Sequence, residues 1–261
     1  MLGKLLKYDF KFMAKSTMFV YILTLLLAVV IKVIDLLKDK ISILVFMQSL
    51  TILLFVIALF ATFLYTFFVA VKYFYNNMLK DEGYLTHTLP VEKSKLLLSK
   101  GIVAVALHVI SVLVIILALV IVFYKKGLLG DFSSFVNTLA PGVNKVLLWG
   151  VLIATMVLSY LQYLFGFVLA LSWGHSKFSS KMVKSFVYGI VIYMVWQMAS
   201  FILMGIIWLT VPSMSDMMTE NTLNGNDMLL IYVYSIILQI FMVVGEYLLS
   251  VKILNNKLNL E

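Results

Sequence analysis

The sequence predicts an all-α, polytopic membrane protein with six transmembrane helices. Of its 261 residues, 63% are hydrophobic and only 12% are charged, a composition far too apolar for a soluble domain. Six apolar segments are long enough to cross about 30 Å of hydrocarbon, and all three prolines lie at segment ends. We expect residues 1–15 to form an amphipathic interfacial helix and residues 16–261 to form the six-span transmembrane domain.

The composition also argues against several classes of function. All 20 basic residues are lysines, and without the arginine fork nucleic-acid binding is poorly supported. The absence of cysteine excludes disulfides, thiolate metal sites and cysteine nucleophiles. The chain has no GxxxxGK[ST] loop, no HExxH and no GxSxG. We therefore predict no catalytic residues, no metal ligands and no cofactor site in this chain, which is expected not to be an enzyme.

The first fifteen residues have the pattern of a helix lying in the headgroup plane. Lys4, Lys7, Lys11 and Lys15 share one narrow stripe, and leucine, phenylalanine and methionine cover the opposite side. Asp9 interrupts the apolar side, where a carboxylate needs a partner. Either it turns sideways to a neighbouring lysine, or it anchors this helix to the bundle or to a cytoplasmic subunit.

The six predicted spans are residues 17–34, 41–75, 91–124, 146–173, 182–211 and 228–254. Ser16 is a suitable N-cap for the first span. The second span would be about 50 Å long as one helix, so it must tilt or project into water. In the fourth span, Gly166, Ala170 and Gly174 recur every four residues, which predicts close packing of helix backbones. No internal repeat suggests the inverted halves of a secondary transporter.

The lysines also predict the orientation of the chain. With a cytoplasmic N-terminus, fourteen of the 20 lysines lie on the inside, in agreement with the positive-inside rule. Both termini are then cytoplasmic, as is the segment of residues 75–100. The last outer loop carries no lysine but has Asp216 and Glu220, with Asp227 at its end.

Residues 75–100 are the longest polar interruption of the chain. Gly83 is a plausible stop for the incoming helix, and residues 84–88 are long enough for one or two helical turns. Pro90 fits the first turn of the next helix, where its missing N–H costs nothing. This pattern indicates a short helix at the membrane surface that is available to a partner; the alternative is an ordinary interfacial loop.

Polar residues inside the spans are candidate functional positions because their burial in lipid is expensive. They form stripes that line either helix–helix contacts or a shared cavity. The candidates for lining a pathway are Gln48, Thr51, Phe55, Thr62 and Tyr65 in the second span and Tyr193, Gln197 and Ser200 in the fifth. In the sixth span the stripe includes Ser235, Gln239, Glu246 and Ser250.

Two ionisable residues within the spans have alternative interpretations. Glu246 either pairs with Lys252 by snorkelling towards the interface, or acts as a conformational latch or substrate contact. His108, in the third span, is more readily explained as a satisfied buried imidazole than as a ligand or base.

One segment carries a resemblance to a known family. NNMLKDEGYLTHTLPVEKSKLLLSK (76–100) is similar to the FYxxLFxDEGYLTxTLPVxxxxLLxSK segment of small permeases from low-GC Gram-positive bacteria. Weaker similarities are the KYDFK opening (7–11) and LSWGHSK (171–177). Together with the six-span layout, the chain resembles the membrane subunit of ATP-binding-cassette (ABC) export permeases of the type V class.

The resemblance implies a half-transporter in a bacterial plasma membrane. A second permease subunit, identical or paralogous, would complete the pathway, and two copies of a separate ATP-binding subunit would hold ATP and Mg. The residues implied to couple to that subunit are Asp81, Glu82, Gly83, Tyr84, Leu85, Thr86, His87, Thr88, Leu89 and Pro90. The implied cargo is hydrophobic or amphipathic, such as a peptide antibiotic or bacteriocin. The alternatives are an ATP-independent channel or carrier, and an immunity protein that sequesters peptide.

Overall fold

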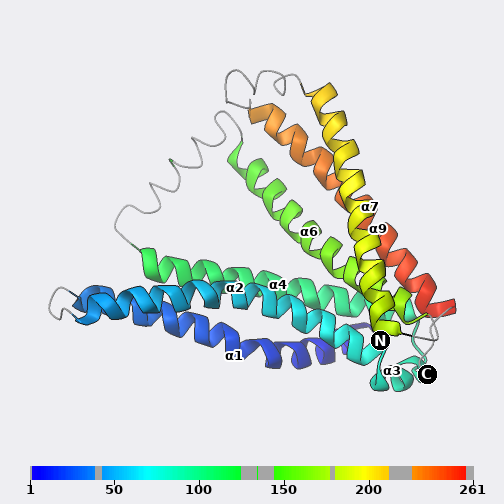
Figure 1. The fold of residues 1–261 in the computed structure, drawn as a ribbon, viewed down its shortest axis with the longest axis horizontal. Helices are drawn as coiled ribbons and strands as arrows, with labels where there is room; N and C mark the ends of the chain where they lie inside the picture. Colours follow the sequence, from blue (N-terminus) through cyan, green and yellow to red (C-terminus); the bar gives the residue numbers. More distant parts are fainter. Residues whose placement is uncertain are drawn as a thin grey trace. The chain divides into compact units, whose positions relative to one another are not determined.

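The computed structural model describes residues 2–38, 43–124, 134, 144–176, 180–211 and 225–256. Their regular structure is entirely helical (Figure 1). The helices are α1 (Leu2–Leu37), α2 (Ile43–Met78), α3 (Asp81–Thr88), α4 (Lys93–Phe123), α6 (Lys145–Gly174), α7 (Lys181–Thr210) and α9 (Gly225–Asn256). The chain forms two compact units: the first contains α1, α2 and α4, and the second contains α6, α7 and α9.

Among the described residues, six helices are long and apolar enough to cross a membrane, and α3 is the exception. The last five of these helices begin and end within three residues of the predicted bounds. Large apolar side chains such as Phe19, Phe46 and Phe241 are exposed along them. Lipid solvates such surfaces favourably, whereas water does not. The prediction of a multi-pass membrane protein built from six apolar helices is therefore confirmed at this level.

In the first unit, α1 packs along both α2 and α4. The centre of the unit is a cluster of apolar side chains from all three helices: Ala28, Ile31, Phe55 and Ala118. Buried hydroxyls add hydrogen bonds between the helices, since Thr24 Oγ1 lies 2.6 Å from Thr62 Oγ1 and Tyr21 Oη lies 3.0 Å from Thr66 Oγ1. Such bonds join helices in a medium where water cannot compete for them.

The prediction that the N-terminal residues form a separate helix is wrong in one respect: α1 has no break at Ser16. One helix of 36 residues runs from Leu2 to Leu37, so Ser16 does not cap the first span. The reason is a single packing seam with a spacing of three and four residues, which continues through the expected boundary. Its buried members are Asp9, Met13, Thr17, Tyr21, Thr24, Ala28, Ile31 and Ile34. Whether the first fifteen residues lie at the membrane surface stays a prediction.

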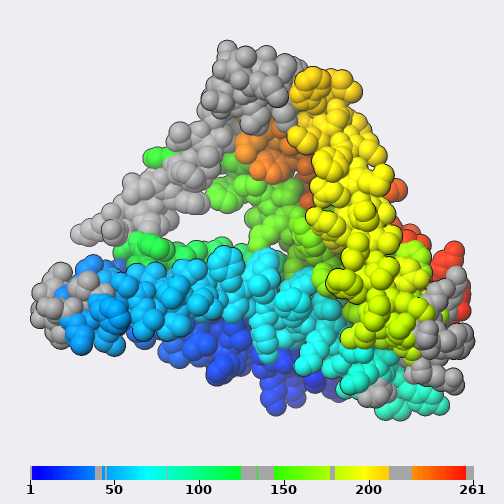
Figure 2. All heavy atoms as spheres, viewed as in Figure 1, coloured from blue at the N-terminus to red at the C-terminus, as the bar shows by residue number. Residues whose placement is uncertain are grey.

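In the second unit, α6 packs against both α7 and α9. The predicted close approach of backbones occurs at Gly174, where an added Cβ would lie 2.7 Å from Ser185 Cα and 2.5 Å from Ser185 N on α7. By contrast, α7 buries only Ser185, Ile192 and Ile207 along its length. In the space-filling view α7 (yellow) is uncovered over most of its length (Figure 2). Most of the α7 surface is therefore not covered by the other helices of the second unit.

Candidate functional site

The predicted short helix occurs as α3, but its start differs from the expectation. Because α2 already ends at Met78, Gly83 does not stop the incoming helix and instead lies inside α3. Gly83 N–H donates to Lys80 O at 2.7 Å, which closes the turn at the start of α3. The chain thus turns between α2 and α3 at residues 79–80, ahead of Gly83.

The expectation that Pro90 occupies the first turn of the next helix is also wrong. Helix α4 begins at Lys93, with Glu92 as its N-cap residue. Val91 N–H donates to Leu89 O at 2.7 Å in a tight turn, and the first helical bonds are those from Lys95 N–H and Leu96 N–H to Glu92 O. Pro90 lies within this turn, where its fixed φ is equally acceptable.

The two sides of α3 differ in exposure. Gly83 and Thr86 are buried, whereas Tyr84 and Leu85 each expose 69% of their surface. Two large apolar side chains exposed next to each other on a helix of eight residues are unfavourable in water. We therefore expect another apolar surface to cover them. Of the other predicted members, Glu82, His87, Thr88, Leu89 and Pro90 are wholly or partly exposed, and the side chain of Asp81 lies outside the described part of the structure.

His87 links α3 to the end of α2. Its Nε2 lies 3.0 Å from Met78 O, so this nitrogen carries the proton and donates to the carbonyl. Nδ1 is buried and has no hydrogen-bond partner among the described residues. Burial lowers the pKa of His87, and the nearby Lys93 lowers it further, while the bond to Met78 opposes both. Neutral His87 therefore matches this position and the imidazolium does not.

Asp9 is buried at the centre of a polar cluster that joins all three helices of the first unit. Its carboxylate accepts from Tyr73 Oη on α2 at 2.6 Å and from Ser99 Oγ on α4 at 2.7 Å. Lys100 Nζ lies 3.5 Å from the carboxylate and 4.5 Å from the centre of the Tyr73 ring. Of the two interpretations, anchoring to the bundle is the one that these contacts support; the sideways turn to a neighbouring lysine does not occur.

Three members of this cluster were missed by sequence reasoning. Lys100 ends the segment of residues 75–100 that the lysine count places on the cytoplasmic side, yet its side chain is only 7% exposed. Tyr73 and Ser99 carried no signal, because a single tyrosine or serine in an apolar helix is common. The useful signal was the misplaced acid itself, since Asp9 on an apolar helix face needs a partner within the bundle.

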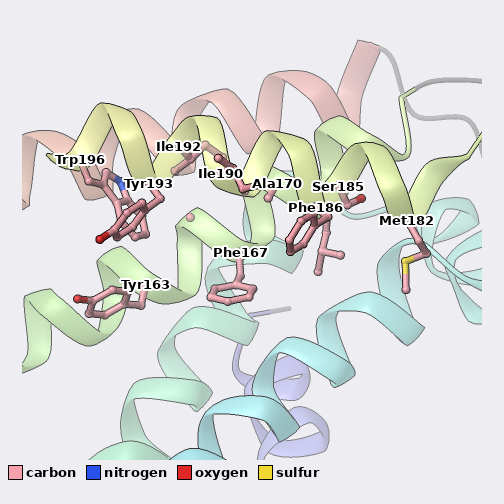
Figure 3. Close-up of a pocket in the computed structure, with 13 residues that line it drawn as sticks. Tyr163, Phe167, Ala170, Met182, Ser185, Phe186, Ile190, Ile192, Tyr193 and Trp196 are labelled. Atoms are coloured by element: carbon pink, nitrogen blue, oxygen red, sulfur yellow. The ribbon is translucent and has the colours of Figure 1, made fainter. Parts of the chain in front are cut away.

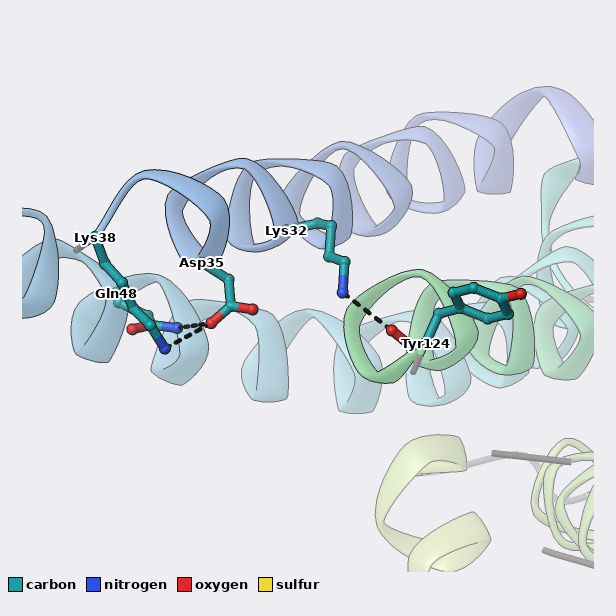
Figure 4. A network of polar contacts seen from close by, with 5 residues as sticks. All are labelled: Lys32, Asp35, Lys38, Gln48 and Tyr124. Atoms are coloured by element: carbon teal, nitrogen blue, oxygen red, sulfur yellow. Dashed lines mark hydrogen bonds and ion pairs between the residues drawn. The ribbon is translucent and has the colours of Figure 1, made fainter. Parts of the chain in front are cut away.

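The polar stripe of α2 serves contacts within the first unit. Phe55 and Thr62 are buried between helices, and Gln48 donates to Asp35 at 3.1 Å, beside the Lys38–Asp35 ion pair at 2.8 Å (Figure 4). Thr51 is partly exposed and bonds its own helix, and Tyr65 is exposed. Helix–helix packing is therefore the interpretation that the α2 residues favour, with Tyr65 as the exception.

The stripe of α9 also faces its neighbours. Gln239 Nε2 donates to Ser159 Oγ on α6 at 2.9 Å, and Trp196 on α7 donates its indole N–H to Glu246 Oε1. Glu246 is buried, and its Oε2 has no partner among the described residues. The expected ion pair between Glu246 and Lys252 is not found in this part of the chain. Glu246 instead bridges two helices of the second unit through an indole that the sequence did not single out.

The predicted residues of α7 are the most accessible of the set. Tyr193, Gln197 and Ser200 are all exposed on this helix. Tyr193 also borders an open groove of about 470 Å³ between α6 and α7 (Figure 3). Apolar and aromatic side chains make up nearly all of its wall, including Tyr163, Phe167, Phe186 and Trp196.

The described histidines and acids do not gather into a metal site. No group of three or more His, Asp or Glu side chains is close enough to hold an ion within the part of the chain that the structure describes. His108 is buried and packs edge-on against Phe63, with 4.8 Å between ring centres. The acidic loop residues Asp216 and Glu220 lie outside the described residues.

Comparison with models of protein families, with curated proteins and with solved structures finds no match to this chain.

Proposed function

We propose that this chain is the membrane-spanning permease subunit of an ATP-driven exporter, with α3 as the contact for a separate ATP-binding subunit. The observation that carries the proposal is the exposed Tyr84–Leu85 pair on α3. This pair lies in the segment whose sequence resembles the coupling region of type V ABC permeases. The six apolar helices are consistent with such a subunit, which would hold no nucleotide itself.

In this proposal ATP is held by the partner subunit, so the energy for transport must enter the permease through its contact with that subunit at α3. ATP binding would close two copies of the partner subunit and displace α3, which is connected to α2 and α4 by only a few residues at each end. Helices of 36 and 31 residues are stiff rods, so a small displacement of α3 would become a tilt of both. His87 would transmit the motion to α2 through its bond to Met78.

The pathway would form with a second permease subunit, identical or paralogous, in a bacterial plasma membrane with both termini cytoplasmic. Exposed α7, with Tyr193, Gln197 and Ser200, would offer a surface for that subunit or for cargo. These side chains are uncharged, which suits a hydrophobic or amphipathic molecule such as a peptide antibiotic.

The test is to replace Tyr84 or Leu85 by Asp and to measure co-purification of an ATP-binding subunit and transport-coupled ATP hydrolysis. We expect both to be lost while membrane insertion is kept, because a carboxylate cannot be buried in an apolar contact. Tyr124→Asp is the matched control, since Tyr124 is 62% exposed and lies just after the opposite end of α4. Equal ATPase stimulation in all three variants would refute the assignment.

Two outcomes would point to the rival functions. Transport by the purified chain alone, driven by an ion gradient, would identify an ATP-independent channel or carrier. Protection of cells from a peptide antibiotic that survives loss of ATP hydrolysis would identify a protein that sequesters the peptide.

A further inference from the structure

Glu246 is a carboxyl group buried inside the second unit, with 6% of its surface exposed. It lies eight residues before Leu254, the predicted end of the last span, which corresponds to about 12 Å along the axis of α9. Trp196 on α7 donates its indole N–H to Oε1, whereas Oε2 is buried and has no hydrogen-bond partner among the described residues. The two oxygens of Glu246 therefore share a single neutral donor within the described part of the chain.

The helices that pack against α9 place no described cation beside this carboxyl group. On α6 and α7 the nearest landmarks are Gly166 and Trp196, since a Cβ added to Gly166 would lie 2.6 Å from Trp196 Cη2. The titratable side chains within two helical turns of these landmarks are all phenols: Tyr160, Tyr163 and Tyr193. The lysines of the two helices are at least twelve residues along the chain from the landmark of their own helix: Lys145, Lys181 and Lys184.

The remaining titratable groups near Glu246 do not supply a positive charge to it either. His175 follows the end of α6, nine residues beyond Gly166. On α9 itself Tyr247 is the next residue, and its ring packs against Phe165. Lys252 is exposed and six residues away, and it forms no ion pair with Glu246 in the described structure. The environment of Glu246 is thus one indole, aromatic rings and aliphatic side chains.

An ionised carboxylate does not match such an environment. Moving an unpaired ion out of water costs far more than moving a neutral carboxylic acid, and lipid around the bundle offers no water to offset that cost. In the neutral acid, Oε1 is the carbonyl oxygen that accepts from Trp196, and Oε2 carries the proton. The neutral form therefore accounts for both the single donor and the burial.

The same contact helps to hold α7 in place. This helix buries only Ser185, Ile192 and Ile207 along its length, so few side chains attach it to its neighbours. Trp196 bonds to α9 through Glu246 and meets α6 through Tyr163, with 5.5 Å between ring centres (Figure 3). If α7 moved away from α9, Glu246 would lose its donor and become accessible to water or to lipid headgroups, where the carboxylate is the stable form.

We propose that Glu246 is a proton-binding site, which holds a proton while α7 is packed on α9 and releases it when the two helices separate. The packed form then binds one more proton than the separated form. Raising the pH therefore favours separation, and lowering it favours packing. Any step that moves α7 is coupled to one proton. The inference needs neither an ATP-binding partner nor a particular cargo, so it can fail or succeed independently of the proposed function.

The first test is infrared spectroscopy of the full chain in lipid vesicles at neutral pH. The chain has five glutamates, and labelling their side-chain carboxyl carbon with ¹³C separates their bands from those of the aspartates. We expect a carbonyl band of a protonated carboxylic acid that moves to lower frequency with this label and is lost in Glu246→Gln. Asp227→Asn, which removes the acid in the first turn of α9, is the control and should keep the band.

The second test follows the separation of the helices. Replacing Trp149, Trp173 and Trp208 by Phe leaves Trp196 as the single tryptophan. As the pH is raised from neutral, we expect its fluorescence emission to move to longer wavelength over the same range in which the acid band disappears. With Glu246→Gln the emission should stay at short wavelength, because the amide oxygen still accepts from the indole but cannot ionise.

Each measurement has an outcome that would overturn the proposal. Absence of the acid band at neutral pH would mean that Glu246 is ionised in the packed unit, and persistence of the band in Glu246→Gln would place the proton on another glutamate. Loss of the band without a change in Trp196 emission would mean that Glu246 ionises without separation of the helices. If Glu246→Gln does not reconstitute, Trp196→Phe decides: removing the indole donor should raise the frequency of the labelled band, and an unmoved band would exclude Glu246 as its source.

Discussion

Replacing Asp9 by Ala should destabilise the first unit more than any single change at an exposed position. The change removes the acceptor of two hydroxyls, those of Tyr73 and Ser99, and leaves the Lys100 ammonium buried without its anion. Breaking a buried ion pair by removing one partner costs about 3–5 kcal/mol. The 3.5 Å separation of Lys100 and Asp9 is long for a charged hydrogen bond, so we expect the lower half of that range.

The assay is unfolding of the purified protein in mixed micelles to which increasing amounts of a denaturing detergent are added. The free energy of unfolding is extrapolated to zero concentration of that detergent. Lys100→Met and the double variant complete a mutant cycle. We expect the double variant to be less destabilised than the sum of the single variants, because removing both charges leaves no unpaired ion.

The exposed Glu92–Lys95 ion pair, at 3.1 Å, provides the control. Lys95 lowers the pKa of Glu92, yet both side chains are largely in water, so Glu92→Gln should leave stability unchanged within error. Unaltered stability of Asp9→Ala, or strict additivity in the cycle, would refute the view that Asp9 joins the three helices.

Three further changes test the packing of single residues. Gly174→Ala should cost about 1–3 kcal/mol, because its methyl group would overlap the backbone of Ser185, whereas Gly150→Ala, with nothing within 4 Å, should be neutral in the same thermal unfolding measurement. Thr62→Val should cost about 0.6–1.7 kcal/mol of stability by removing the 2.6 Å hydrogen bond between Thr62 and Thr24. A stability equal to that of the wild type would show that this bond does not contribute to it. The lowered pKa of His87 means that its folded position favours the neutral imidazole. We therefore expect α3 to be held most firmly above pH about 6.5, the ordinary pKa of histidine. As the pH falls towards the folded-state pKa, protonation favours conformations in which His87 has left this position, so α3 should loosen. Hydrogen exchange of the α3 amides, corrected for intrinsic rate, should show this loosening, and a flat pH profile would contradict it.

Sequence reasoning located the helices but not their contacts. A length of about twenty apolar residues is a local property, and it placed five spans within three residues of their observed bounds. The errors occur where the evidence was equally local. Ser16 looks like a cap and Gly83 like a stop, yet a serine is tolerated inside a helix whose packing seam continues past it. Likewise the turn before α3 lies at residues 79–80, ahead of Gly83.

For the polar residues, too, the sequence shows which helix face they lie on, and the packed helices show what they contact. Their number, their spacing on one helix face and their cost in lipid could all be read from the order of the residues, and Asp9 and Glu246 were identified on that basis. Which side chain each one meets depended on helices far apart in the chain: Asp9 meets Tyr73, Ser99 and Lys100, and Glu246 meets Trp196. Helical periodicity specifies a face, but only the packed helices specify what lies opposite that face, because pairing between apolar rods depends on shape as much as on hydrophobicity.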